Sequence, residues 1–324
     1  MKKLKWLSFL FLSILFLLFV SMLSFIVGPS FVSPFSKDPF ERAILYEIRL
    51  PRILLGFGAG GSLALSGAIL QGIFRNGLVE PYTLGISGGA VIGVCIGLVL
   101  SVQRIIGFFP LPAFGFLGSL SVLFVLLYLS GRRALRREEL LLSGVMISFI
   151  SSSLVLLFFA LLRIEEIHKI MFWMMGSLQE EDTVLIASIA FLSLLGLFAS
   201  YIFSFDLNAL ALGEEEAMHL GINVLRTKRL LLLLSSFLTG LTVSITGIIG
   251  FVGLVIPHTM RLLLGSDYRF LLFSSFFFGA SFLILCDTIA RTIISPSELP
   301  VGVVTGVIGG TLFLYLLYRG RKSG

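Results

Sequence analysis

Long apolar runs separated by short polar stretches dominate this chain. Residues 6–27, 53–74 and 140–162 contain no charged residue. A helix needs about 20 mostly apolar residues to cross a bilayer, whereas a barrel strand shows only about 10 residues of alternating polarity. Unpaired backbone groups are costly in lipid, so continuous runs of this length favour helices. The pattern predicts an all-α, polytopic membrane protein.

About ten segments are long or apolar enough to be transmembrane helices of a single domain over residues 1–324. The eighth contains Gly250, Gly253 and Pro257, so we expect an interrupted helix that is buried among others. A shorter piece at 167–176 is expected to lie in the membrane interface. The ten segments are 6–27, 52–74, 84–101, 108–130, 139–162, 184–204, 229–248, 250–264, 271–291 and 302–318.

The first apolar run follows Lys2, Lys3 and Lys5, as the core of a signal peptide would. At 6–27 it exceeds the 7–15 residues of such a core, and no small-residue cleavage site follows it. We therefore expect a retained helix.

The distribution of Lys and Arg predicts the orientation. With ten crossings and a cytoplasmic N-terminus, 16 of these residues fall inside and 8 outside. This excess agrees with the positive-inside rule and puts both termini in the cytoplasm. Charged residues make up only 13% of the chain against about 25% in soluble proteins. The anionic inner leaflet explains the net charge of +6 without a nucleic-acid partner.

Glycine is abundant, with 34 residues concentrated in the apolar segments, where small residues let helices approach closely. A weak internal repeat is also visible at a shift of 180 residues, between spans that run in opposite directions. The shift superposes Gly60 on Gly240, Ser62 on Thr242, Ser66 on Thr246 and Gly67 on Gly247.

The longest polar stretch between spans covers residues 206–229 and lies inside in this topology. Glu214, Glu215 and Glu216 favour the start of a short helix, and Gly221 favours its end. Two interpretations remain open at this point. The stretch is either a solvated connecting helix or a docking surface for a cytoplasmic partner.

Three arginines fall on the opposite side. Arg49 and Arg52 precede the second span, and Arg291 ends the ninth, four residues after Asp287. The ordinary interpretations are snorkelling of the Arg pair and an i,i+4 ion pair between Asp287 and Arg291. Positive charge on the disfavoured side would also be explained by an acidic external partner.

The sequence offers no catalytic or metal-binding constellation. No phosphate-binding loop of the GxxxxGK[ST] type occurs, so we expect that the chain does not hydrolyse ATP itself. His168, His219 and His258 fall in separate segments, and Cys95 and Cys286 each stand alone. We expect no metal site and no bound cofactor.

Several long motifs resemble the FecCD-type permeases, which import iron chelates, haem and vitamin B12. The leading signature is RLPRILLGFGAGGSLALSGAILQGIFRNGLVEPYTLGISGGA (49–90). The second and third are GIIGFVGLVIPHTMRLLLGSDYR (247–269) and DTIARTIISPSELPVGVVTGVIGG (287–310). MFWMMGSL (171–178) and LGEEEAMHLGIN (212–223) match intervening stretches, so the likeness covers residues 45–318.

The resemblance implies the fold of a type II ABC importer permease, in a homodimer or a pair of homologues. It implies two separate ATPase subunits that use ATP and Mg, and a periplasmic or lipid-anchored substrate-binding protein. The expected location is the cytoplasmic (inner) membrane of a prokaryote. The expected substrate is a ferric siderophore, haem or cobalamin, with siderophore favoured by the frequency of such systems in the family.

The resemblance also implies residue roles. Arg49, Arg52 and Arg291 match arginines that receive acidic residues of the binding protein in the vitamin B12 importer. The fifth span lines the pathway in relatives, which implies that role for Met146, Ser148, Ser151 and Ser152. The stretch at 206–229 looks like the coupling helices that contact the ATPase, which implies this role for Glu214, Glu215, Glu216, Ala217, Leu220 and Gly221.

Two other classes of protein are less favoured by the residues. An ion-coupled secondary transporter usually needs carboxylates within its spans, and only Asp287 approaches that description. A membrane-embedded enzyme would need a catalytic group, and none is visible in the sequence.

Overall fold

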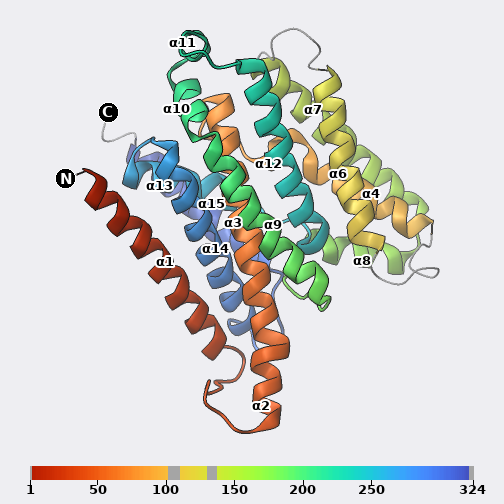
Figure 1. The fold of residues 1–324 in the computed structure, drawn as a ribbon. Coiled ribbons are helices and arrows are strands. Elements are labelled where there is room, and N and C mark those ends of the chain that lie inside the picture. Colours follow the sequence, from red (N-terminus) through yellow and green to blue (C-terminus); the bar gives the residue numbers. More distant parts are fainter. Residues whose placement is uncertain (1, 101–109, 130–136, 321–324) are drawn as a thin grey trace.

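The structure is a computed structural model that describes residues 2–100, 110–129 and 137–320 (Figure 1). Its regular elements within those ranges are all helical. Each of the ten apolar segments contains one main helix, as predicted. These are α1 (Lys2–Ile26), α3 (Leu50–Phe74), α4 (Ile86–Val99), α6 (Pro110–Leu129), α7 (Arg137–Leu161), α9 (Thr183–Ile202), α12 (Val224–Thr246), α13 (Val252–Leu264), α14 (Tyr268–Thr292) and α15 (Val301–Gly320).

Seven of the described helical stretches are long and apolar enough to cross a membrane, and three apolar helices are shorter. Two of the shorter ones, α4 and α13, follow stretches without α-helix at 75–85, which contains the short 3-10 helix η2 (Pro81–Leu84), and at 247–251. Non-helical backbone at membrane depth is tolerated where protein covers it. The short helix α8 (Ile164–Met174) occupies the piece expected at 167–176.

Helix α3 lies at the centre of the bundle, between α9, α12, α13 and α14 (Figure 1). Its glycines allow backbone contact with its neighbours. A Cβ atom on Gly60 would lie 2.4 Å from the carbonyl oxygen of Gly279, and one on Gly67 would lie 1.8 Å from that of Gly253. Both positions therefore require glycine, and the packing interpretation of these residues is confirmed.

The expected interruption of the eighth span lies before the helix and not inside it. Gly253 and Pro257 both belong to α13, and the irregular chain precedes Val252. Proline lacks the N–H group that would bond to the carbonyl four residues earlier. That carbonyl, of Gly253, instead accepts a hydrogen bond of 3.3 Å from Gln71 Nε2 on α3. The side chain of Gln71 thus satisfies the carbonyl that Pro257 leaves free, and α13 continues through Pro257.

Helices α3 and α12 run in opposite directions, as an inverted repeat requires (Figure 1). Helix α3 packs along α14, and α12 packs along α6. The superposed glycines both face a close neighbour, since Gly60 meets Gly279 of α14 and Gly240 meets Ser119 of α6. The arrangement is consistent with the weak repeat in the sequence.

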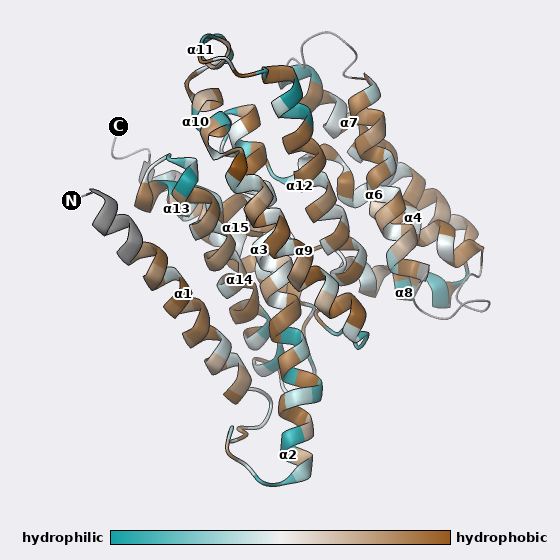
Figure 2. Ribbon diagram, viewed as in Figure 1, coloured by the Kyte–Doolittle hydropathy of each residue, from teal (hydrophilic) through white to brown (hydrophobic). Residues whose placement is uncertain are grey.

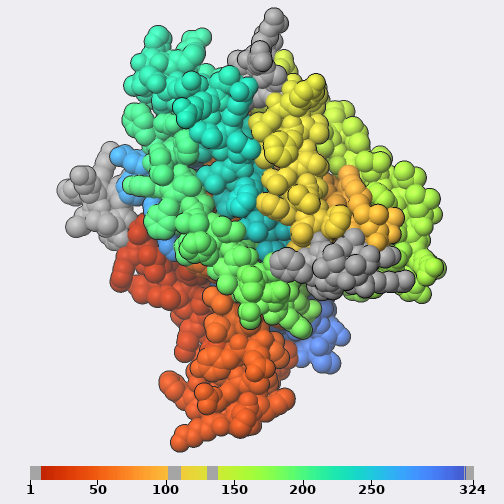
Figure 3. Space-filling view, turned by 45° about the vertical axis from the view of Figure 1, so that its right-hand side comes forward, coloured from red at the N-terminus to blue at the C-terminus, as the bar shows by residue number. Residues whose placement is uncertain are grey.

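The bundle has two polar ends with an apolar middle between them (Figure 2). One end, here called the arginine end, carries α2 (Pro39–Ala43) and the π-helix η1 (Ile44–Arg49), which continues into α3. The opposite end, here called the α11 end, carries α10 (Ser204–Leu212) and α11 (Glu214–His219). In the space-filling view, α2 and the adjoining turns project beyond the rest of the molecule at the arginine end (Figure 3).

Candidate functional site

The arginine end brings together three arginines that are far apart in the sequence. Arg49 ends η1, Arg52 lies in the first turn of α3, and Arg291 lies in the last turn of α14. Helices α10 and α11, which belong to the stretch predicted inside at 206–229, lie at the other end of the bundle (Figure 1). The sequence interpretation was therefore right that these three arginines share one end.

Arg49 is buried, with 1% of its surface exposed. Its Nη1 donates to the carbonyl oxygens of Phe25 at 2.9 Å and Ile26 at 2.6 Å, and its Nη2 donates to that of Ser30 at 2.6 Å. The last carbonyls of a helix lack intrahelical partners and carry partial negative charge. Arg49 thus holds the end of α1 and the chain that follows it, and it does not reach for the membrane surface.

Arg291 and Asp287 form the predicted i,i+4 ion pair, with 2.9 Å between Nε and Oδ2. Arg291 is 2% exposed, and its Nη2 also donates to Ser24 Oγ at 2.9 Å. Asp287 Oδ1 lies 3.9 Å from Arg52 Nη1. The carboxylate of Asp287 therefore lies between two guanidinium groups, which compensate for its burial.

Arg52 is the most exposed of the three arginines, at 9%. Its Nη2 lies 2.8 Å from Glu298 Oε2, and that same oxygen accepts a hydrogen bond from Gln179 Nε2. Glu298 belongs to the chain between α14 and α15, and Gln179 to the chain between α8 and α9. Sequence reasoning missed both residues, because Glu298 is far in sequence from Arg52 and Gln179 is far in sequence from Glu298.

Helix α11 has the boundaries that the sequence predicted. It begins at Glu214, and Gly221 follows it with a φ of 82°, the left-handed conformation that favours glycine after a helix. Ala217 is fully buried against Ala209 and Leu210 of α10.

One side of α11 contacts the bundle and the other is exposed. Glu214 Oε1 lies 2.7 Å from Lys228 Nζ of α12, and Lys228 is 2% exposed. Met218 and Leu220 are exposed, as are Glu215 and Glu216. A cavity of about 330 Å³ lies at this junction. It is lined by Glu214, Met218, Ile222, Asn223, Val224, Leu225 and Lys228.

Helix α10 is attached to the bundle by hydrogen bonds that the sequence analysis did not identify. Asn208 Nδ2 donates to Asp267 Oδ1 at 2.9 Å, and Asn208 Oδ1 accepts from the Tyr268 backbone N–H at 2.9 Å. Asp267 is the N-cap of α14, and hydrogen bonds from Arg269 hold the pKa of its carboxyl below the usual value. An aspartate directly before an apolar run is an N-cap signal that could have identified the start of α14 but not the contact with Asn208.

The four residues expected to line a pathway do not share one face of α7. Met146 and Ser152 are exposed, whereas Ser148 is half-buried and Ser151 is buried. A Cβ atom on Gly88 of α4 would lie 2.5 Å from the Cβ of Ser151, so Ser151 lies against α4. The hydroxyls of Ser148 and Ser152 donate to carbonyls of α7 itself.

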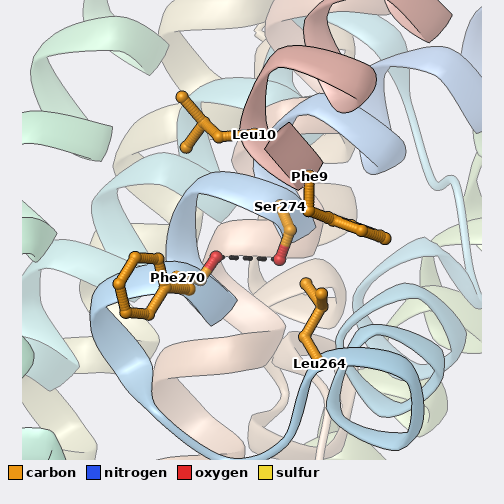
Figure 4. Close-up of a pocket in the computed structure, with 5 residues that line it drawn as sticks. All are labelled: Phe9, Leu10, Leu264, Phe270 and Ser274. Carbon is orange, nitrogen blue, oxygen red and sulfur yellow. Dashed lines mark hydrogen bonds between the residues drawn. The ribbon is translucent and has the colours of Figure 1, made fainter. Parts of the chain in front are cut away.

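The described histidines are dispersed over separate helices, and the pocket beside α1 is small. His168, His219 and His258 lie on α8, α11 and α13, and no cluster of three or more potential ligands for a metal occurs among the described residues. The pocket between α1, α13 and α14 has a volume of about 10 Å³, the space of one water molecule (Figure 4). Ser274 Oγ there donates to the Phe270 carbonyl oxygen at 2.8 Å.

Sequence comparison relates nearly the whole chain to known permeases. The profile of the FecCD transport family matches residues 9–319. The hemin transport system permease protein HmuU of Yersinia pestis is 40% identical over 86% of this chain and 84% of its own length. The vitamin B12 import system permease protein BtuC of Klebsiella pneumoniae is 38% identical over 96% and 93%. The molybdate import system permease protein MolB of Haemophilus influenzae is 36% identical over 89% and 84%.

Structural comparison gives the same result. The chain superposes on a solved structure described as the inward-facing conformation of an ABC transporter of the metal-chelate type. The TM-score is 0.88 and the identity 33%, over 96% of this chain and 99% of the other. A second structure, PsaBC of Streptococcus pneumoniae, has a TM-score of 0.60 at 16% identity and supports the fold alone.

Proposed function

This chain belongs to the FecCD transport family and is the permease subunit of an ABC importer, and from that premise we propose that its cargo is a metal chelate. Ferric siderophore, haem and cobalamin are the candidates. The observation that carries the proposal is the likeness to the metal-chelate transporter at 33% identity over almost the full length of both chains. Relatives named for hemin and vitamin B12 support it, and the molybdate relative supplies the competing candidate.

Uptake by the complete transporter tests this proposal. We would reconstitute the chain in liposomes with its ATPase subunits and its external binding protein, then supply each chelate and molybdate in labelled form. The expected result is ATP-dependent accumulation of one chelate. Accumulation of molybdate alone would overturn the proposal, and uptake driven by an ion gradient without ATP would favour the secondary transporter.

The family assigns ATP hydrolysis to a separate subunit and makes an ATPase and a substrate-binding protein the partners of this chain. The isolated permease should accordingly show no ATP turnover. Asp287, the carboxylate that best suited an ion-coupled transporter, is paired with Arg291 and near Arg52. That pairing supports a structural role for Asp287.

The α11 end is the proposed contact with the ATPase, and therefore the cytoplasmic end. Its support is the combination of a fixed base and an exposed apolar surface. Lys228 and Ala217 fix α11 to the bundle, while Met218 and Leu220 are exposed beyond it. Large exposed apolar side chains at the end of a membrane bundle indicate a protein contact. With ten crossings, both termini are then cytoplasmic as well.

The arginine end is the proposed contact with the external binding protein. Support comes from the match of Arg49, Arg52 and Arg291 to the family's docking arginines and from their grouping in space. Arg49 and Arg291 are almost fully buried and bonded within the chain. An incoming carboxylate would therefore reach Arg52 first. Arg291 is linked to Arg52 only through Asp287, and Arg49 is bonded to the chain at the end of α1.

The pathway is proposed to run along α7, at the contact with a second copy of this chain. Only 17% of the residues in the apolar stretch of α7 are buried inside the protein, the smallest share among the seven long spans. Met146 and Ser152 lie on its exposed surface and are the better candidates for the pathway lining. Ser151 contributes instead to the contact with α4.

A further inference from the structure

Arg52 already has a carboxylate partner in the undocked chain. Glu298 Oε2 lies 2.8 Å from Arg52 Nη2. The other nearby carboxylate, of Asp287, is 3.9 Å from Arg52 and is engaged by Arg291 at 2.9 Å. The shorter contact of Arg52 is therefore with Glu298, a geometry typical of a charge-assisted hydrogen bond.

Glu298 is also the more exposed of the two carboxylates near Arg52. Its side chain is 29% exposed, against 7% for that of Asp287. It lies in an exposed segment between α14 and α15, in which Ile293 and Ile294 are 65% and 55% exposed. The segment is attached through the Leu299 N–H, which donates to the Ala290 carbonyl at 3.0 Å, and through Gln179, which donates to Glu298.

The charges explain why this contact matters for an acidic partner. Three arginines and two carboxylates leave the cluster one positive charge, and removal of the Glu298 charge would leave two. A partner carboxylate that approaches Arg52 meets both a reduced attraction and an occupied guanidinium edge. Specific docking can depend on such a competing group as much as on the attraction itself.

We propose that Glu298 occupies the position on Arg52 that a carboxylate of the binding protein takes when it docks. The partner's carboxylate must then displace Glu298 from Arg52. The proposal rests on the docking function proposed above for the arginine end. Glu298 then keeps Arg52 paired while no binding protein is present, and it weakens docking so that the binding protein can be released.

The decisive variant is Glu298→Gln in the complete transporter, reconstituted in nanodiscs with its ATPase subunits. Glutamine keeps the size of the side chain and can still accept from Arg52, but it lacks the competing charge. We expect the affinity for the transporter's own binding protein to rise roughly fivefold, the scale of one partly exposed ion pair. Gln179→Ala removes the other hydrogen bond to Glu298 and should raise the affinity by a smaller factor.

Glu47→Gln is the matched control. Glu47 is exposed on η1 at the same end, and no ion pair within the described chain involves it. Equal tightening by Glu47→Gln and Glu298→Gln would mean a general effect of charge and would overturn the proposal. Unchanged or weaker binding by Glu298→Gln would overturn it as well.

The double variant Arg52→Ala/Glu298→Gln, together with the single Arg52 variants, distinguishes the displacement of Glu298 from docking at Arg52 itself. If Glu298 acts through Arg52, the gain from Glu298→Gln disappears in the Arg52→Ala background, and its persistence would contradict the proposal. If Arg52→Ala and Arg52→Glu leave the affinity of the binding protein unchanged, then docking at Arg52 itself is wrong. If they weaken it while Glu298→Gln has no effect, only the displacement of Glu298 is wrong.

Discussion

The two ends of the bundle differ in what their buried charged groups contact and in what they expose. At the arginine end, the guanidiniums of Arg49 and Arg291 lie inside and are bonded to carbonyls and to Asp287. At the α11 end, one buried cation, Lys228, pairs with Glu214 below a helix that exposes Met218 and Leu220. The charges of the first end connect parts of the chain to one another, whereas the surface of the second is available to a partner.

This difference separates two kinds of contact. A partner of the α11 end can pack on side chains that are already exposed, and the gain comes from apolar area. A partner of the arginine end, as proposed, would exchange one ion pair for another, so its net gain would be small and would depend on salt. Variants at the arginine end should therefore divide into those that damage the fold and those that tune docking.

The largest effect expected is on stability, from Arg49→Ala. Three carbonyl groups lose their donor, including those at the end of α1, and a large buried side chain is removed. We expect a loss of about 3 kcal/mol, seen as a lower melting temperature in detergent. Arg42→Ala is the control, because Arg42 is exposed on α2 at the same end. Equal melting temperatures for the two variants would show that Arg49 does not hold α1.

The next largest effect concerns the α11 end, where Ala217→Pro should abolish uptake without preventing membrane insertion. Proline in a helix interior costs about 3 kcal/mol, and here it removes the hydrogen bond from the Ala217 N–H to the Gly213 carbonyl. Ala217→Ser keeps the helix and is the control. Transport activity and membrane-fraction immunoblots measure the two outcomes. Normal uptake by Ala217→Pro would make the segment a connector only.

A smaller effect is expected from Met218→Asp. Met218 is 57% exposed, so the bundle itself should be unaffected. The free energy of unfolding should stay within about 0.5 kcal/mol of wild type, with a nearly unchanged melting temperature. A charge in an apolar contact should reduce the amount of ATPase subunit that copurifies with the permease, whereas Met218→Leu should not. If Met218→Asp retains the ATPase fully, the exposed side of α11 is not the contact surface.

The helices could be predicted from the sequence because each depends on local pattern. The ten apolar segments became helices, and α11 begins at Glu214 and ends before Gly221 as the charge and glycine signals indicated. The interruption expected at Gly250, Gly253 and Pro257 lies in the chain around Gly250, before α13 begins. Gly253 and Pro257 do not interrupt α13, and the carbonyl that proline leaves free is bonded to Gln71, which is far away in sequence.

The arrangement of the candidate sites was less predictable, because it depends on contacts between residues that are far apart in the sequence. Charge counting put Arg49, Arg52 and Arg291 at one end but could not reveal that Arg49 and Arg291 are buried. The burial of these two arginines depends on contacts with Ser30 and Ser24, whose proximity arises only when the helices pack. The uneven exposure of Ser148, Ser151 and Ser152 likewise follows from the position of α4 against α7.

The smallest effect, and the one that best tests the contrast between the two ends, is expected from charge changes at Arg52. Arg52→Glu should weaken docking of the external binding protein more than Arg52→Ala, because reversal adds repulsion where alanine only removes attraction. The difference should be a few-fold at low salt and should shrink as salt rises, since exposed charges are screened over about 8–10 Å at physiological ionic strength.

The measurement is the affinity of the binding protein for the reconstituted transporter across a salt series. Arg226→Glu is the matched control: Arg226 is exposed in the first turn of α12, next to α11, so its reversal should leave external docking unchanged. Snorkelling would predict instead that Arg52→Lys is harmless and that reversal reduces insertion. Because Arg52 is bonded to Glu298 and not aimed at lipid, we expect Arg52→Ala to insert normally and to change docking. Arg52→Glu also places a third carboxylate beside Glu298 and Asp287, so it should in addition lower the melting temperature. Equal affinities of wild type, Arg52→Ala and Arg52→Glu at low salt would remove Arg52 from the docking surface and leave the arginine end with a structural role alone.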